Sequence, residues 1–223
     1  MTFALDHIFI CASFEAPEAN HLIDFGLTEG TGNTHPGQGT SCRRFFFHNA
    51  MLELLWLHNE EEAKSEIILP LRLYERCKYK ETNASPFGIC LRPMNKGETD
   101  FPFDCWSYCP SYLPENVSMY IAESSTLVDE PLLFYSPMSV RQDQYTQERK
   151  QPLEHKAGFR EITSVRITMP KSEAYSPALR AINKMEQIEI KQGNENLLEL
   201  FFDDEKENKF VDFRPELPLL FYW

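Results

Sequence analysis

The stretch that decides the fold is MLELLWL, which runs from Met51 to Leu57. Its residues are apolar on both sides of an extended chain, which is typical of a strand buried on both faces. Glu53 is the exception, because it places a carboxyl group inside this apolar run. Such a group must be paired, protonated or bound to a metal, since an unpaired buried charge costs too much free energy. The run is therefore both a predicted strand and a candidate for chemistry.

The residues before this strand predict one helix and three further strands. Residues 4–11 alternate and are rich in Ile and Phe, which indicates a strand, and a short helix follows that Gly26 closes. A polar, Gly-rich stretch over 29–40 contains a weak strand, and 42–48 form the strand next to the central run. The order is strand, helix, weak strand, strand, strand. It defines a first βαβββ unit over residues 1–58.

The same order of elements returns near the C-terminus. Residues 162–169 alternate as a strand, and Ser176 followed by Pro177 supplies a helix N-cap with proline at the first helical position. Further strands are expected at 188–190, 197–202 and 210–213. We therefore expect a second βαβββ unit over residues 161–223.

The middle of the chain is expected to hold a degraded third unit without a good helix, over residues 85–136. Its predicted strands are 87–91, 105–108, 119–122 and 132–135. A helical connection over 59–84, interrupted at Pro70, precedes this unit, and a polar linker over 137–160 follows it. The sequence thus predicts an α+β chain of repeated βαβββ units.

The composition argues against several classes of function. The 223 residues include 22 Lys and Arg against 34 Asp and Glu, which gives a formal net charge of −12. A chain this acidic repels phosphate backbones and anionic lipid, and no apolar run approaches the roughly 20 residues that cross a bilayer. The N-terminus lacks the basic region of a signal peptide, and the six Cys are dispersed. We expect a cytoplasmic protein with reduced thiols that binds neither nucleic acid nor membrane.

Polar groups recur at matching places on the predicted strands. His7 lies in the first strand, Glu53 in the fourth, and Glu199 repeats the arrangement of Glu53 in the C-terminal unit. Imidazole and carboxylate groups from neighbouring strands are a starting set for a divalent metal such as Zn, Fe, Mn, Co or Ni. The alternative is that His7 hydrogen-bonds Glu53 or a buried carbonyl and holds no metal. Strand alternation places His7 on one face with Leu5, Phe9 and Cys11.

Four segments resemble the glyoxalase-like branch of the vicinal oxygen chelate superfamily. They are Leu5-Asp6-His7-Ile8, His35-Pro36-Gly37-Gln38-Gly39-Thr40, Met51-Leu52-Glu53-Leu54 and Leu153-Glu154-His155-Lys156-Ala157-Gly158. The resemblance implies paired βαβββ units whose curved mixed sheets form incomplete barrels around a pocket. It also implies a metal held by a His or Gln on the first strand and a Glu on the fourth strand of each of two units.

Carried over residue by residue, the resemblance assigns the metal ligands His7, Glu53 and Glu199. Ser164 stands where the C-terminal unit would need His or Gln, so the four-ligand set is incomplete. One divalent metal (Zn, Ni, Fe or Mn) is then held by an altered set, with His35 as a third ligand for instance, or no metal is bound. In the middle unit the matching positions fall near Gly88 and near Leu133 or Phe134.

The loop over 35–40 and the two arginines after it resemble the signature loop of this branch. Its glycines free backbone N–H groups and permit tight turning near a pocket, and Arg43 or Arg44 could clamp a carboxylate or phosphate. Alternation points one arginine inward and the other outward, and the alternative role for one of them is an ion pair with Glu53. The expected substrate-binding residues are His35, Gly37, Gly39, Thr40, Arg43 and Arg44.

These features predict a protein that acts on or binds an anionic small molecule. In the first hypothesis, a metal or polar cluster at His7 and Glu53 polarises a substrate for isomerase, lyase or dioxygenase chemistry. Glu53 is then catalytic, and His155 either acts as a general acid or base at the pocket mouth or caps a strand end. In the second hypothesis, the chain sequesters a compound without chemistry, as resistance proteins of this superfamily do. In the third, the polar groups of the pocket only satisfy one another. Exposed sheet edges are compatible with a homodimer.

Overall fold

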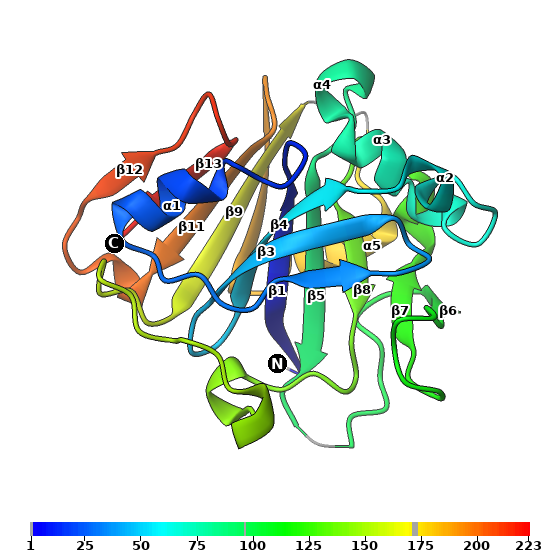
Figure 1. The fold of residues 1–223 in the computed structure, drawn as a ribbon, viewed down its shortest axis with the longest axis horizontal. Coiled ribbons are helices and arrows are strands. Elements are labelled where there is room, and N and C mark those ends of the chain that lie inside the picture. Colours follow the sequence, from blue (N-terminus) through cyan, green and yellow to red (C-terminus); the bar gives the residue numbers. More distant parts are fainter. Residues whose placement is uncertain (1, 96, 171–173) are drawn as a thin grey trace.

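The computed structural model describes residues 2–95, 97–170 and 174–223. Two mixed sheets form the framework of the fold (Figure 1). The first has eight strands in the order β2-β3-β4-β1-β5-β8-β7-β6, and the second has five in the order β10-β9-β11-β13-β12. The predicted fold class, an α+β chain with curved mixed sheets, is confirmed. No helix in the described ranges is long and apolar enough to cross a membrane.

The eight-stranded sheet consists of two copies of one four-strand arrangement. The N-terminal copy contains β1 (Phe3–Cys11), β2 (Asn33–His35), β3 (Thr40–Phe46) and β4 (Met51–Leu57), and the middle copy contains β5 (Phe87–Pro93), β6 (Cys105–Tyr108), β7 (Met119–Ala122) and β8 (Leu132–Tyr135). The first strand of each copy pairs in parallel with the fourth, and the other pairs are antiparallel. The copies meet where β1 and β5 run antiparallel. The middle unit therefore completes the sheet that the N-terminal unit begins.

Successive side chains along each strand point to opposite faces of this sheet, and both faces are buried. Ile8 and Ile10 of β1 point to the core between the two sheets, together with Leu52 and Leu54 of β4. Phe9 of β1 and its neighbours on other strands point to the opposite, concave face. Both faces are covered, which explains why the run from Met51 to Leu57 is apolar on both sides.

The C-terminal unit has the predicted helix and four strands in the predicted order, but it adds a strand over 219–222 that was not predicted from the sequence, and its strand order differs from that of the N-terminal unit. It contains β9 (Ile162–Pro170), α5 (Pro177–Ile182), β10 (Ile188–Gly193), β11 (Leu197–Phe202), β12 (Phe210–Asp212) and β13 (Leu219–Tyr222). Here β9 lies between β10, to which it is parallel, and β11, to which it is antiparallel. In the N-terminal unit the first strand instead pairs in parallel with the last. The C-terminal unit is thus no topological repeat of the other two, although its sequence pattern is similar.

Each sheet receives a helix from the unit that forms the other sheet. Helix α1 (Ala19–Phe25) follows β1 but packs on the five-stranded sheet, where the ring of Phe25 contacts Phe213, Phe221 and Trp223. Helix α5 follows β9 but lies against the middle unit, and its N-cap residue Ser176 donates its backbone N–H to Glu130 Oε1 at 2.6 Å. No α-helix lies between β5 and β8 within the described residues. Helix α5 supplies the helix that the middle unit lacks.

Residues 59–84, called the roof segment below, cover the concave face of the eight-stranded sheet. They form α2 (Glu60–Ala63), the 3₁₀ helix η1 (Leu69–Leu71) around Pro70, α3 (Leu73–Cys77) and α4 (Tyr79–Thr82). Leu71 and Leu73 of this segment are buried against the concave face. The remaining connections carry the short 3₁₀ helices η2 (Glu123–Thr126), η3 (Gln142–Gln144), η4 (Gln147–Arg149) and η5 (Asp203–Glu205).

Candidate functional site

An open cavity of about 540 Å³ lies on the concave face, and the roof segment lines part of it. This volume is within the range of small-molecule sites in proteins. The wall from the N-terminal half of the sheet is polar and includes Asp6, His7, His35, Arg44 and Glu53. The wall from the middle half is largely apolar and includes Met119, Ile121, Leu132 and Phe134, with Leu71 and Leu73 added by the roof. The cavity therefore has one polar side and one apolar side.

A β-bulge at Asp6 brings two polar side chains to the same place. Leu5 pairs with Leu91 of β5 and His7 pairs with Cys90, so Asp6 is the extra residue between them. Leu5 consequently lies in the core between the sheets, and the expectation that it shares a face with His7 is wrong. Because of the bulge, both Asp6 and His7 line the cavity.

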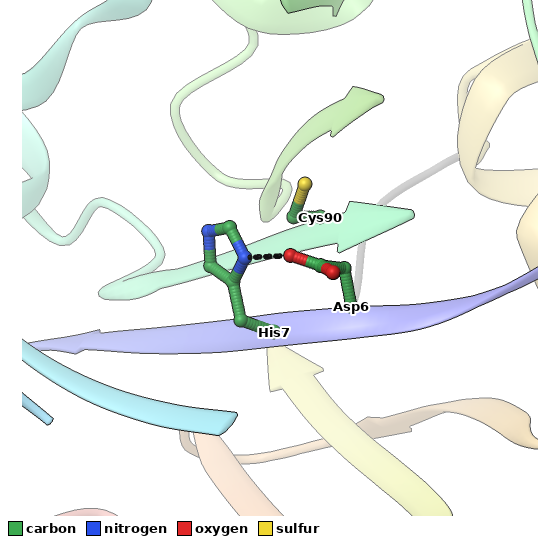
Figure 2. Close-up of side chains that lie close together, drawn as sticks. All are labelled: Asp6, His7 and Cys90. Atoms are coloured by element: carbon green, nitrogen blue, oxygen red, sulfur yellow. Dashed lines mark hydrogen bonds and ion pairs between the residues drawn. The ribbon is translucent and has the colours of Figure 1, made fainter. Parts of the chain in front are cut away.

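Asp6 and His7 form a close pair at the centre of the sheet. Asp6 Oδ2 lies 2.7 Å from His7 Nδ1, and Nε2 lies on the opposite side of the ring (Figure 2). Asp6 Oδ1 is buried and has no hydrogen-bond partner among the described residues. Cys90 is buried beside the pair on the neighbouring strand (Figure 2). This arrangement fixes the imidazole ring and leaves one carboxylate oxygen unsatisfied.

The charges around His7 hold a proton on its ring. Burial lowers the pKa of His7, but the Cys90 sulfur, the Glu53 carboxylate and the hydrogen bond to Asp6 outweigh it, so the pKa lies well above its usual value. Burial also raises the pKa of Cys90 to about 11, so that this residue is a neutral thiol near pH 7. Asp6 and Glu53 are the acidic side chains that favour the protonated form of the His7 ring.

Glu53 is buried on β4, next to Phe9 of β1 and opposite Arg44 of β3 in the sheet register. No salt bridge joins Glu53 to a basic side chain anywhere in residues 2–95, 97–170 and 174–223. Arg44 instead donates to the carbonyls of Thr31 and Gly32, at 2.7 and 3.2 Å. Burial, with a further contribution from Glu53, raises the pKa of the Cys42 thiol well above its usual value. Glu53 is thus a carboxyl group directed into the cavity beside the His7 imidazolium.

The glycine-rich loop binds a carboxylate of the protein itself. Gly37 and Gly39 have φ values of +81° and +77°, and their N–H groups donate to Glu62 Oε2 at 2.7 and 3.0 Å. Glu62 belongs to α2 of the roof segment. The two N–H groups that we expected to face a substrate are therefore already satisfied by the roof.

A hydrogen-bonded network at the cavity wall positions His35. His35 Nδ1 lies 3.0 Å from Thr40 Oγ1, which also accepts a hydrogen bond of 2.7 Å from Gln38 Nε2. Gln38 Oε1 in turn accepts from the hydroxyls of Tyr108 and Tyr112, at 3.0 and 3.1 Å. Burial lowers the pKa of His35, so this ring is neutral at pH 7. The two tyrosines come from the middle unit, and no local motif in the sequence marks them.

Six of the residues singled out in the sequence lie away from the cavity wall: Gly37, Gly39, Thr40, Arg43, His155 and Glu199. Arg43 forms a two-pronged ion pair with Glu29, with both contacts at 2.6 Å. Both ring nitrogens of His155 contact backbone groups. Nδ1 accepts a hydrogen bond from the N–H of Thr28 at 2.9 Å, and Nε2 lies 3.0 Å from the carbonyl oxygen of Phe46. Glu199 lies on the five-stranded sheet and pairs with Arg166 at 3.2 Å. The contacts of His155 are those of a loop anchor, which was the alternative to a catalytic role.

The residues present do not supply the four-ligand metal set of the superfamily. The register of β5 with β8 repeats that of β1 with β4, and it places Gly88 and Phe134 at the positions that correspond to His7 and Glu53. Neither residue has a ligand atom, and a side chain at Gly88 would collide with the ring of Phe9. Asp6, His7 and Cys90 do have potential ligand atoms within 4.8 Å of one another, but the Nδ1 atom of His7 is already bonded to Asp6.

Comparison with known proteins supports the fold alone. No protein-family model matches the sequence, and no curated protein matches it. A crystal structure of a hypothetical protein from Staphylococcus aureus is similar over 98% of both chains, with 13% sequence identity and a TM-score of 0.58. A hypothetical protein from Bacillus halodurans C-125 matches 63% of this chain and 98% of its own, with 13% identity and a TM-score of 0.39. The open, curled mixed sheet is compatible with a vicinal oxygen chelate-like fold.

Proposed function

We propose that this chain is a glyoxalase-like member of the vicinal oxygen chelate superfamily that binds an anionic small molecule and transfers a proton on it. The observation that carries the proposal is the His7 ring, which contacts Asp6 through Nδ1 at 2.7 Å and lines the polar side of the cavity together with Glu53, and whose pKa is raised by these neighbours. A cation that can donate a proton and a carboxylate that can accept one are the two groups that enolisation of a carbonyl compound requires.

His7 and Glu53 divide the chemistry between them in this proposal. Nε2 of His7, on the side of the ring away from Asp6, donates a hydrogen bond to the carbonyl oxygen of the substrate. Glu53 removes a proton from the adjacent carbon, and the negative charge that develops on the oxygen is stabilised by the imidazolium. Return of the proton to a different atom gives an isomerase, and expulsion of a leaving group gives a lyase. Asp6 keeps the ring oriented and charged.

Two arginines support a substrate that is an anion with an apolar body. Arg44 and Arg149 both line the cavity, and neither forms a salt bridge with a carboxylate in the part of the chain that the structure describes. Arg149 instead stacks on the ring of Tyr145 at 4.5 Å. A carboxylate bound by these groups would place the remainder of the substrate against the apolar wall formed by Leu132 and Phe134.

Carbon–hydrogen exchange in heavy water tests this function. The protein is incubated in D₂O with 2-oxo and 2-hydroxy carboxylic acids that carry aromatic or alkyl tails, and deuterium incorporation is followed by NMR. We expect exchange with at least one such acid, a loss of at least about 100-fold in Glu53→Gln, and weaker binding in Arg44→Gln. The matched control is Arg43→Gln, because Arg43 is adjacent but bound to Glu29 away from the cavity wall. Undiminished exchange in Glu53→Gln would overturn the assignment.

A second candidate function is sequestration without chemistry. It is favoured by Gly88 and Phe134, which occupy the corresponding ligand positions of the middle unit and leave that side of the cavity apolar. In this case the same acids raise the melting temperature of the parent protein, and the rise depends on Arg44 but not on Arg43. No exchange is then detected in the parent protein, which distinguishes this function from proton transfer.

A further inference from the structure

Two cysteines contact each other where the roof segment meets β1. Cys11 is the last residue of β1, and Cys77 is the last residue of α3. Their Sγ atoms are 3.3 Å apart. A disulfide bond needs about 2.05 Å, so rotations of the two side chains have to close a gap of about 1.2 Å. The two thiols are thus close enough to be joined without a rearrangement of the fold.

A buried positive charge lies beside the two thiols. Arg76 is fully buried beside both sulfurs, and its guanidinium group is bonded to backbone carbonyls, with no carboxylate partner among the described residues. Burial and the contact with Cys77 raise the pKa of Cys11 well above its usual value, and Arg76 opposes this rise. A neighbouring positive charge is a recurrent feature of reactive cysteines.

Cys77 is the sulfur that a dissolved reagent can reach. It is only half-buried, whereas Cys11 is fully buried. A second cavity, of about 350 Å³ and distinct from the one that contains His7, opens next to Cys77 and includes Lys78 and Lys80 in its wall. This cavity gives a small oxidant access to Cys77. Its wall also includes Glu18, Glu60 and Glu81, and Lys78 pairs with Glu60 at 3.3 Å.

We propose that Cys11 and Cys77 are a site of reversible oxidation, at which hydrogen peroxide converts two thiols into an intramolecular disulfide bond. The Cys77 sulfur attacks a peroxide oxygen, the O–O bond breaks, and Cys77 becomes a sulfenic acid while one water molecule leaves. The Cys11 sulfur then attacks the Cys77 sulfur, the S–S bond forms, the S–O bond breaks, and a second water molecule leaves. The two thiols lose two electrons and two protons, which hydrogen peroxide takes up as two molecules of water.

The disulfide bond would tie the roof segment to the strand that carries His7. Leu71 and Leu73, close to Cys77 in the sequence, line the cavity, so the bond would hold the roof over it. A long chain segment lies between the two cysteines, and closing such a loop in the unfolded state stabilises the folded state. We expect the melting temperature of the oxidised protein to rise by about 5 °C or more.

Peptide mapping of the oxidised protein tests the proposal. The full chain with Cys109→Ser, which removes an exposed thiol, is treated with one equivalent of hydrogen peroxide, alkylated in denaturant and cleaved after glutamate. We expect a species that joins residues 1–15 to residues 76–81 and is two hydrogens lighter than the sum of the two peptides. Dithiothreitol should remove both this species and the rise in melting temperature.

Two variants complete the test. Cys77→Ser in the same background should lose the linked peptides and the thermal shift, whereas Cys105→Ser should keep both. The proposal is overturned if Cys77 is recovered as a sulfinic acid or linked to another cysteine while Cys11 remains alkylatable. Because mapping of the Cys109→Ser protein decides this point, the result does not depend on whether Cys77→Ser folds. It is also independent of any activity in the main cavity.

Discussion

Arg76 is buried without a counter-ion, and its replacement should be among the most damaging single changes in the roof segment. Its guanidinium group donates to the carbonyl of Glu130 at 2.5 Å, and to those of Ser125 and Leu127 at 3.1 and 3.2 Å. Longer contacts reach the carbonyls of Leu71 and Ser85, at 3.3 and 3.5 Å. Burial lowers the pKa of Arg76 to about 10, so the group is still charged at pH 7. One side chain thus joins the roof to the segment around η2.

The expected cost of Arg76→Met follows from these contacts. A buried carbonyl that loses its donor costs about 1–3 kcal/mol, and several carbonyls lose one here. Removal of the buried charge offsets part of this, because its desolvation cost is itself several kcal/mol. We expect a net loss of about 3–5 kcal/mol, because at least three close carbonyl contacts are lost and the removed desolvation cost offsets only part of that loss. For a chain of this length that corresponds to a fall of about 6–20 °C in melting temperature.

Urea denaturation followed by circular dichroism measures this loss. The control is Arg72→Met, since Arg72 makes a surface ion pair with Glu75 at 2.7 Å and should lose no more than about 1 kcal/mol. If Arg76→Met unfolds within about 1 kcal/mol of the parent protein, with an unchanged slope, then the carbonyl contacts do not stabilise the roof and the reasoning fails.

Three further predictions concern the glycine-rich loop over 35–40 and the Asp6–His7 pair. Gly39→Ala should cost about 2–4 kcal/mol in urea denaturation, because its Cβ would meet the carbonyl of Asn59 at a positive φ, whereas Gly158→Ala, also at positive φ but in open space, should cost about 1 kcal/mol. Glu62→Gln replaces the carboxylate that accepts from the N–H groups of Gly37 and Gly39 with a weaker acceptor, so hydrogen exchange at these two amides should become faster. An unchanged exchange rate would contradict the contact. Because the folded-state pKa of His7 is raised, its contribution to stability is full below about pH 6.5 and is lost as the pH rises through the folded value. Urea midpoints should therefore fall over that range in the parent protein and fall less in His7→Gln.

Much of the secondary structure could be predicted because alternation and turn residues are local signals. Three strands of the middle unit, 105–108, 119–122 and 132–135, have the predicted bounds, and β9 differs from its prediction by one residue. The position of Glu53 in a strand covered on both faces also follows from its apolar neighbours. These features depend on residues adjacent in the chain, which a single sequence displays directly.

The rest depends on contacts between distant segments. Nothing in residues 5–7 shows that Asp6 is an extra residue in its strand, because the bulge is defined by the partner strand β5. Nor does the sequence of the loop over 35–40 indicate that its N–H groups donate hydrogen bonds to Glu62. The strand order of the C-terminal unit could not be predicted from the sequence for the same reason. The alternation of β9 is the same whichever strands it pairs with, and in the structure these are β10 and β11.

The exchange of helices between the two sheets bears on where the chain can be cut. A fragment that ends at residue 160 would keep every strand of the eight-stranded sheet, yet it would lose α5 and the surface on which Phe25 packs. A fragment that begins at residue 161 would lack α1, so Phe213 and Phe221 would lose their contacts with Phe25. Each half is therefore completed by a piece that only the other half encodes. Expression of either half alone should therefore give a less stable protein than expression of the span from β1 to β13.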